Sequence, residues 1–186
     1  MGDEAAIDAA LEDYETLEGG VKGELAAEKT KLDSFKTQVN SSRGSTAALR
    51  SWLEGLPENT KDNPYTVVYT GAGAAGALYN ALGAGGKYVN LDLSQSRVTG
   101  FAHNTEAGRE LVVELILPDT LEETQDSYSA TASTFGGFSI LKKVRSSGLL
   151  RLGDNAFSNC VNLEEIRLDE AAEIGLYAFQ GCTGLT

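Results

Sequence analysis

Two copies of one short pattern, 22 residues apart, constrain this chain more than any other feature of its sequence. The segments Leu152–Leu163 and Ile174–Leu185 carry the same residue at five aligned positions, which are Gly153/Gly175, Ala156/Ala178, Phe157/Phe179, Cys160/Cys182 and Leu163/Leu185. One step earlier, an apolar series keeps the same offset of 22 from the later residues: Phe135, Phe138, Leu141 and Val144. A unit this short cannot bury its own apolar face, but stacked units share one continuous core. The repeat therefore predicts a solenoid.

Strand-like pieces extend this spacing toward the N-terminus. Val67 and Leu91 are 24 residues apart, and Leu91 and Leu115 are again 24 apart. The next step, from Leu115 to Val144, is 29 residues, and we interpret its polar stretch Thr124–Ser133 as an insertion. The predicted strands are Thr66–Thr70, Val89–Leu93, Val113–Leu117, Leu141–Arg145 and Glu164–Leu168. Each is followed by a turn and a short return segment.

Alternation along these strands divides their side chains between a core face and an exposed face. The residues expected to face the core are Val67/Tyr69, Leu91/Leu93, Leu115/Leu117, Val144 and Ile166/Leu168. One exposed column should then contain Val68, Asp92, Ile116, Arg145 and Arg167, and the other Thr66, Asn90, Glu114, Lys143 and Glu165. These columns mix apolar, acidic and basic groups, which favours a protein partner over a small anion. We predict partner binding on the ten residues as a set.

The pattern now shows a resemblance to a known family. Ile-Gly-x-x-Ala-Phe-x-x-Cys-x-x-Leu, present as residues 174–185, resembles the BspA-like leucine-rich repeat. Leu115–Leu121 resembles the strand-and-proline part of that repeat, and Leu56–Tyr65 resembles the opening segment of such domains in treponemal surface proteins. The chain is thus similar to a treponemal leucine-rich repeat surface protein.

This resemblance implies an α/β repeat fold, with residues 57–186 as a leucine-rich repeat solenoid of about five coils and a parallel concave sheet. It also implies a bacterial cell-surface or periplasmic protein that binds another protein, such as a host matrix component or a second surface protein, in adhesion. An extracellular, cell-surface or periplasmic location is expected on this ground, although the first residues, Met1–Glu4, show no basic region followed by an apolar one.

Residues 1–56 have a different pattern and predict a helical cap or a coiled-coil segment. Apolar residues follow a 4-3 spacing that is broken at Glu18 and Glu28: Ile7, Leu11, Tyr14, Val21, Leu25, Leu32, Phe35 and Val39. Such heptads indicate a coiled coil or a helix packed on a partner. A hairpin hinged at Gly19-Gly20 and Gly23 is an alternative, since each glycine costs about 1 kcal/mol inside a helix. A second helix is expected over Ser45–Leu56, ending before Pro57. Capping of the solenoid and self-association through this segment both remain open.

The turn Gly71-Ala72-Gly73-Ala74-Ala75-Gly76 supports a rival interpretation. It is a GxGxxG that follows a strand and precedes a helix-like segment from Ala77 to Leu82, with Asp92 21 residues after Gly71. The dinucleotide fingerprint requires these parts, so a nucleotide-binding enzyme is the alternative function. We favour a small-residue turn between stacked units, because the helix is expected to last about two turns before Gly83-Ala84-Gly85-Gly86 ends it.

Other chemistry has little support in the sequence. The chain contains two cysteines and one histidine, His103, too few for a zinc site or a disulfide framework. Cys160 and Cys182 are expected to be free, inert thiols in the core. A net charge of −12 argues against nucleic acid, and no apolar run is long enough for a transmembrane segment. We predict no catalytic residues, no cofactor and no metal, and hence a binding protein that is not an enzyme.

Overall fold

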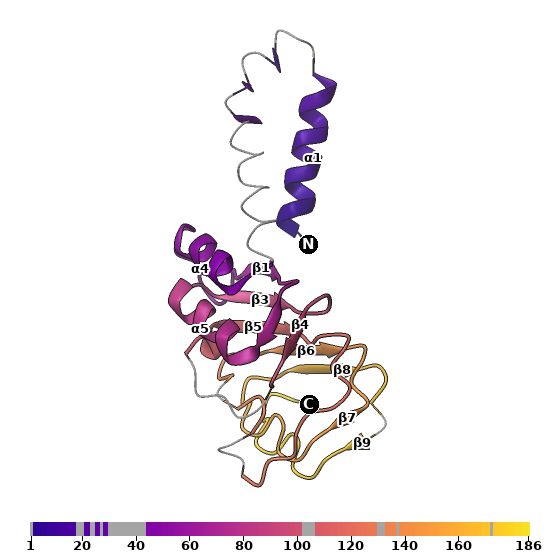
Figure 1. The fold of residues 1–186 in the computed structure, drawn as a ribbon. Coiled ribbons are helices and arrows are strands. Elements are labelled where there is room, and N and C mark those ends of the chain that lie inside the picture. The colour runs from indigo at the N-terminus through magenta and orange to yellow at the C-terminus, as the bar shows by residue number, and fades with distance from the viewer. Residues whose placement is uncertain are drawn as a thin grey trace.

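The chain has an α/β fold with a five-stranded sheet in which all strands are parallel (Figure 1). The computed structural model describes residues 2–17, 21–22, 25–26, 28–29, 44–101, 107–129, 133–136, 138–171 and 173–186. The sheet contains β1 (Tyr65–Val68), β3 (Val89–Asp92), β5 (Val112–Ile116), β6 (Lys143–Ser146) and β8 (Glu165–Leu168), side by side in chain order. Each strand lies within two residues of a predicted one at either end.

The register of the sheet aligns the apolar positions of successive strands. Val67 pairs with Leu91, Leu91 with Leu115, Leu115 with Val144, and Val144 with Ile166. A shift between Val89 and Asn90 accommodates one extra residue in β5. The predicted core-facing residues are buried except for Ile166 and Leu168, which are half-buried. Both lie on β8, the last strand in the sheet order, where only one neighbouring strand covers them.

Aromatic rings continue the core beneath the sheet. Phe157 is fully buried and stacks on Phe135 with ring centroids 4.4 Å apart and planes 12° apart. It also stacks on Phe179 at 6.0 Å and 11°. Tyr79 contacts Phe138 edge-on at 5.5 Å. Residues 22 apart in sequence therefore lie directly above one another in the core.

Two small parallel sheets join the segments that follow the main strands. β2 (Ala72–Ala74) pairs with β4 (Arg97–Thr99), and β7 (Arg151–Leu152) pairs with β9 (Glu173–Ile174). Beyond β7 and β9, the backbone N–H of Phe157 donates to the carbonyl of Ala178 at 2.8 Å. These bonds satisfy backbone groups that would otherwise be buried without partners.

The polar stretch Thr124–Ser133 is only partly an insertion, which corrects the prediction. Residue 123 forms a parallel bridge with Arg151, and the Ser127 carbonyl accepts a hydrogen bond from the Asn155 side chain, both at a separation of 28 residues. At Phe135 the separation from its stacking partner is 22. The extra residues therefore lie between Ser127 and Phe135. Residues 124–127 pack beside residues 151–155 and are not part of the insertion. Thr124 is buried, and its hydroxyl accepts the N–H of Gly153 at 2.8 Å.

Helix α4 (Thr46–Glu54) covers the end of the sheet where β1 lies (Figure 1). Ser45 caps it by accepting the N–H of Ala48, and the helix ends at Gly55, close to the predicted limits. Leu49 and Leu53 are fully buried in the core, and Trp52 contacts the ring of Tyr65. The helix therefore shields the apolar surface of the first strands from solvent.

Helix α5 (Ala75–Gly85) is longer than predicted and runs through two of the glycines expected to end it. A Cβ at Gly83 would lie 2.9 Å from the Ala107 backbone, and one at Gly85 would lie 2.6 Å from Leu53. These glycines permit close packing against the chain before η1 (Arg109–Leu111) and against α4. Only Gly86, with φ 65°, ends the helix. Gly83 and Gly85 were predicted to end the helix, but the structure shows that they allow close packing.

Helix α1 (Gly2–Thr16) ends within the predicted heptad seam. The Tyr14 hydroxyl donates to the Lys22 carbonyl at 2.9 Å, and the Lys22 ammonium bonds the Glu15 carbonyl at 2.7 Å. These contacts place Lys22 beside the last turn of α1, while Gly19, Gly20 and Gly23 of the hairpin alternative lie outside the described residues. Leu32, Phe35 and Val39 of the seam lie outside the described residues.

Candidate functional site

The exposed side of the main sheet carries the two predicted columns of side chains in register. Val68 pairs with Asp92, Asp92 with Ile116, Ile116 with Arg145, and Arg145 with Arg167. The second column is likewise continuous from strand to strand and contains Thr66, Asn90, Glu114, Lys143 and Glu165. We call these ten residues the strand face. They come from five segments spread over about 100 residues of sequence, and the sheet alone brings them together.

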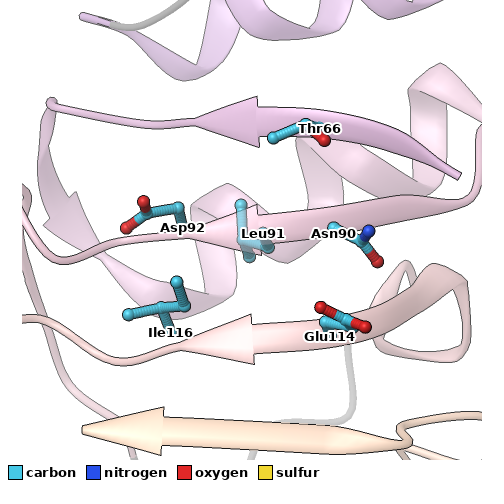
Figure 2. A pocket seen from close by; sticks show the side chains of 6 residues that line it. All are labelled: Thr66, Asn90, Leu91, Asp92, Glu114 and Ile116. Atoms are coloured by element: carbon cyan, nitrogen blue, oxygen red, sulfur yellow. The ribbon is translucent and has the colours of Figure 1, made fainter. Parts of the chain in front are cut away.

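Exposure increases along the first column of the strand face from β1 to β8, whereas the second column is half-buried throughout. Val68, Asp92 and Ile116 are half-buried, whereas Arg145 and Arg167 are exposed. Helix α5 lies behind the strands in Figure 2, on the side opposite to the labelled polar residues. The face is therefore open to a partner while its other side forms the core.

Two ion pairs connect residues of the second column to neighbours on the face. The Lys143 ammonium contacts a Glu114 carboxylate oxygen at 2.9 Å, and Arg167 contacts Glu165 at 2.5 Å. The hydrogen bond that Lys143 donates to Glu114, together with the negative charge of that carboxylate, raises the pKa of Lys143. These pairs are partly exposed to solvent and so add little to stability, but they fix the orientation of four charged groups.

Two charges of the first column have no such counter-ion. Neither Asp92 nor Arg145 forms a salt bridge with any residue that the structure describes. One oxygen of Asp92 accepts the backbone N–H of Ser94 at 2.9 Å, which orients the carboxylate. Ile116 lies between them in the column. An acidic and a basic group are therefore available to a partner, separated by an apolar position.

A hollow of about 160 Å³ lies on the strand face across β1, β3 and β5 (Figure 2). Its lining mixes acceptor groups with apolar atoms and consists of Thr66, Asn90, Leu91, Asp92, Glu114 and Ile116. The side-chain oxygen of Asn90 is buried and has no hydrogen-bond partner among the described residues. Five of the six lining residues belong to the predicted columns, and Leu91 is the core residue between them.

The glycine turn of the nucleotide alternative lies away from this hollow, in the segment that forms β2. The Gly71 carbonyl accepts the N–H of Arg97 at 2.9 Å. A Cβ at Gly71 would lie 2.4 Å from the Tyr69 hydroxyl and 2.8 Å from the Gly44 carbonyl, so only glycine fits there. Asp92, the acidic residue of the fingerprint, instead lines the hollow on the strand face. Packing is thus a sufficient reason for Gly71.

Cys160 and Cys182 are free and buried. Each thiol lies against a carbonyl from the preceding segment: Cys160 Sγ is 3.4 Å from the Phe135 oxygen, and Cys182 Sγ is 3.1 Å from the Phe157 oxygen. Burial raises the pKa of Cys160 to about 12, with a smaller contribution from Cys182. Burial also raises the pKa of Cys182, although a backbone hydrogen bond from Cys160 opposes this shift. His103 lies outside the described residues.

We expect Cys160 to resist thiol reagents in the folded protein, because the thiolate is the reacting form and burial suppresses it. In a Cys182→Ser variant at pH 8, Ellman's reagent should label Cys160 only at the rate of protein unfolding. The same variant in guanidinium chloride should react completely within minutes and provides the reference. Rapid labelling of the native protein would show that the thiol is accessible.

Sequence reasoning missed a second hollow, of about 450 Å³, beside β7 and β9. Tyr128, Leu176 and Tyr177 line it and are largely exposed. Next to it, Arg151 bonds Asp126 at 2.6 Å and Glu173 at 3.3 Å. The backbone N–H of Asp154 and the Arg151 guanidinium lower the pKa of Asp126. The repeat pattern gave no signal for this hollow, because Tyr128 belongs to the irregular stretch.

Comparisons with known proteins add no assignment. No protein-family model, no curated protein and no solved structure matches the chain. Among the described residues, no three or more histidine, cysteine or acidic side chains are grouped so that they could hold a metal ion. Within the same part of the chain, the helices are too short or too polar to cross a membrane.

Proposed function

We propose that the protein is a protein-binding module whose partner lies on the strand face. The observation that carries this proposal is the alignment of the two columns across five parallel strands. The surface is continuous, mixes apolar and charged groups, and leaves Asp92 and Arg145 without counter-ions on the described chain. Protein interfaces combine such features, whereas a small anion would need charges of one sign gathered at one point.

Residues 57–186 are, in this proposal, a leucine-rich repeat solenoid of the BspA-like kind, and the strand face is its concave surface. The ring stacking of Phe135, Phe157 and Phe179 at intervals of 22 residues supports this assignment. So does the equivalent placement of the two thiols against the carbonyls of Phe135 and Phe157. Helix α4 would then be the N-terminal cap.

Adhesion at the cell surface, or binding in the periplasm, follows from the same resemblance. The partner would be a host matrix component or another surface protein. Charge on the first column runs from Asp92 on β3 to Arg145 and Arg167 on β6 and β8. A partner with the reverse order of charge would dock in one orientation only. Self-association through residues 1–56 stays a separate prediction.

A triple variant tests the location of the binding surface. Ile116→Ala, Arg145→Ala and Arg167→Ala together remove one apolar and two basic contacts. We expect at least about a hundredfold weaker binding, since truncation of a hot-spot residue costs about 2 kcal/mol or more and arginine is enriched among such residues. The assay is surface plasmon resonance against a panel of purified extracellular-matrix and bacterial surface proteins.

The matched control also removes one branched aliphatic and two arginine side chains, but at other positions: Arg50→Ala, Arg97→Ala and Leu150→Ala. All three residues are exposed and lie off the strand face. Both variants should keep the wild-type circular dichroism spectrum. Equal binding of the control and the face variant to a ligand of the wild type would contradict the proposed surface.

A further inference from the structure

We propose that the hollow across β1, β3 and β5 receives a lysine or arginine side chain of the protein partner. This inference rests on the proposed function, because it assigns the chemistry of one contact on the strand face. It concerns the six residues that line the hollow: Thr66, Asn90, Leu91, Asp92, Glu114 and Ile116.

The hollow has the size and the apolar wall that a long basic side chain needs. Its volume of about 160 Å³ exceeds that of a water site many times, and atoms of Leu91 and Ile116 line it. Lysine and arginine pack their aliphatic stems on such atoms while their charged heads reach polar groups. Figure 2 shows Leu91 between Asp92 at one end of the hollow and Asn90 and Glu114 at the other, with Ile116 next to Asp92 on the neighbouring strand.

The polar groups of the hollow are arranged to accept hydrogen bonds. Asp92 and Glu114 are the charged residues that line it, and both are acidic. Only one oxygen of Glu114 contacts Lys143, and one oxygen of Asp92 accepts the Ser94 N–H. The second oxygen of each carboxylate therefore has capacity for a donor.

Asn90 provides an independent reason to expect a donor. Its side-chain oxygen is buried and makes no hydrogen bond within the described chain. Asn90 pairs in register with Glu114, so the amide and the carboxylate lie on adjacent strands. Leaving a buried acceptor without a partner costs free energy, which an incoming N–H group would recover.

An organic cation fits this hollow better than a metal ion. Calcium is bound by six to eight oxygen ligands and magnesium by an octahedral set. The lining offers two carboxylates, one amide and one hydroxyl beside an apolar wall. Charge-assisted hydrogen bonds from a guanidinium or ammonium group need fewer acceptors and use the apolar wall as well.

Small probes test the hollow without knowledge of the partner. Nα-acetyl-arginine methylamide and Nα-acetyl-lysine methylamide would be titrated into the ¹⁵N-labelled protein, with the citrulline and norleucine analogues as neutral counterparts. We expect saturable shifts of the amide signals of Asn90, Asp92 and Glu114 with the basic probes. The neutral counterparts should bind at least about tenfold more weakly, because they lack the charge.

Two double variants distinguish binding of the basic probes in the hollow from their attraction to acidic residues elsewhere on the surface. Asp92→Asn with Glu114→Gln should weaken the basic probes at least about tenfold, since both substitutions keep the shape but remove the charges. Glu122→Gln with Glu170→Gln removes the same charge at exposed positions off the strand face and should leave binding unchanged. Calcium chloride is titrated in parallel.

Several outcomes would overturn the proposal: no saturable binding, equal binding of arginine and citrulline probes, equal effects of the two variant pairs, or saturation of the same signals by calcium but not by the basic probes. The fates of the two proposals are distinguishable. If the triple variant of the strand face abolishes partner binding but the basic probes do not bind, the partner surface stands and the hollow's ligand is wrong. If the basic probes bind but the triple variant binds the partner as the wild type does, the ligand of the hollow stands and the proposed partner surface is wrong.

Discussion

Replacing Phe157 by alanine should lower the free energy of unfolding by about 3–5 kcal/mol. The side chain is fully buried and stacks on Phe135 at 4.4 Å and on Phe179 at 6.0 Å. Its removal takes away contacts with rings on two sides and leaves a cavity that neighbouring segments cannot close without shifting their strands. Urea unfolding monitored by circular dichroism would measure the loss.

Tyr128→Ala is the matched control, because it also removes an aromatic ring but from a side chain that is fully exposed. Its stability should stay within about 0.5 kcal/mol of the wild type. A loss of less than about 1 kcal/mol in the Phe157 variant would contradict the central position of this ring in the core.

Gly108→Ala is the second substitution with a large expected effect. Gly108 has φ 110°, a conformation that costs other residues about 1–3 kcal/mol. A Cβ there would lie 2.1 Å from the Tyr79 carbonyl oxygen and 2.6 Å from the Gly83 nitrogen, both backbone atoms of α5. Overpacking of this kind adds roughly 1–3 kcal/mol. We therefore expect a total loss of about 2–6 kcal/mol, the sum of the two ranges.

The control for this prediction is Gly44→Ala. A Cβ at Gly44 would meet nothing within 4 Å, and its φ is not in the positive range. Its stability should therefore equal that of the wild type or rise slightly, because alanine restricts the unfolded chain. Thermal unfolding of both variants gives the comparison. If Gly108→Ala melts like Gly44→Ala, α5 does not approach residue 108 as closely as the structure has it.

Much of the strand face could be predicted because β-strands impose a simple rule. Side chains alternate between the two faces, so identifying Leu91 and Leu115 as core residues places Asp92 and Ile116 on the other face. The equal spacing of Val67, Leu91 and Leu115 then set the register between strands, which the observed pairing matches. Binding by this face was expected from the sequence and remains a proposal.

The roles of particular glycines could not be predicted because they depend on approaching partners. Gly83 and Gly85 lie inside α5, where their missing side chains admit the Ala107 backbone and Leu53. Both partners are more than 20 residues away in sequence. A local reading assigns such glycines to helix termination, since glycine is a poor helix former.

The hollow on the strand face was also beyond sequence reasoning. Its residues were named as members of two columns, but nothing in the sequence indicates that Asn90 has a buried, unpaired oxygen or that Glu114 is held by Lys143. The predicted insertion, Thr124–Ser133, included too many residues for a similar reason. Thr124 belongs to the ordered stack because Gly153 donates to its hydroxyl across 29 residues of sequence.

The sequence by itself determined the spacing of the strands and the division of their side chains into core and face. Both follow from local periodicity, which any segment carries without reference to the rest of the chain. Only the tertiary structure decided where glycine is sterically required, where the extra residues begin, and which polar groups on the face are paired. These depend on distances between segments far apart in sequence, and such distances exist only once the chain has packed.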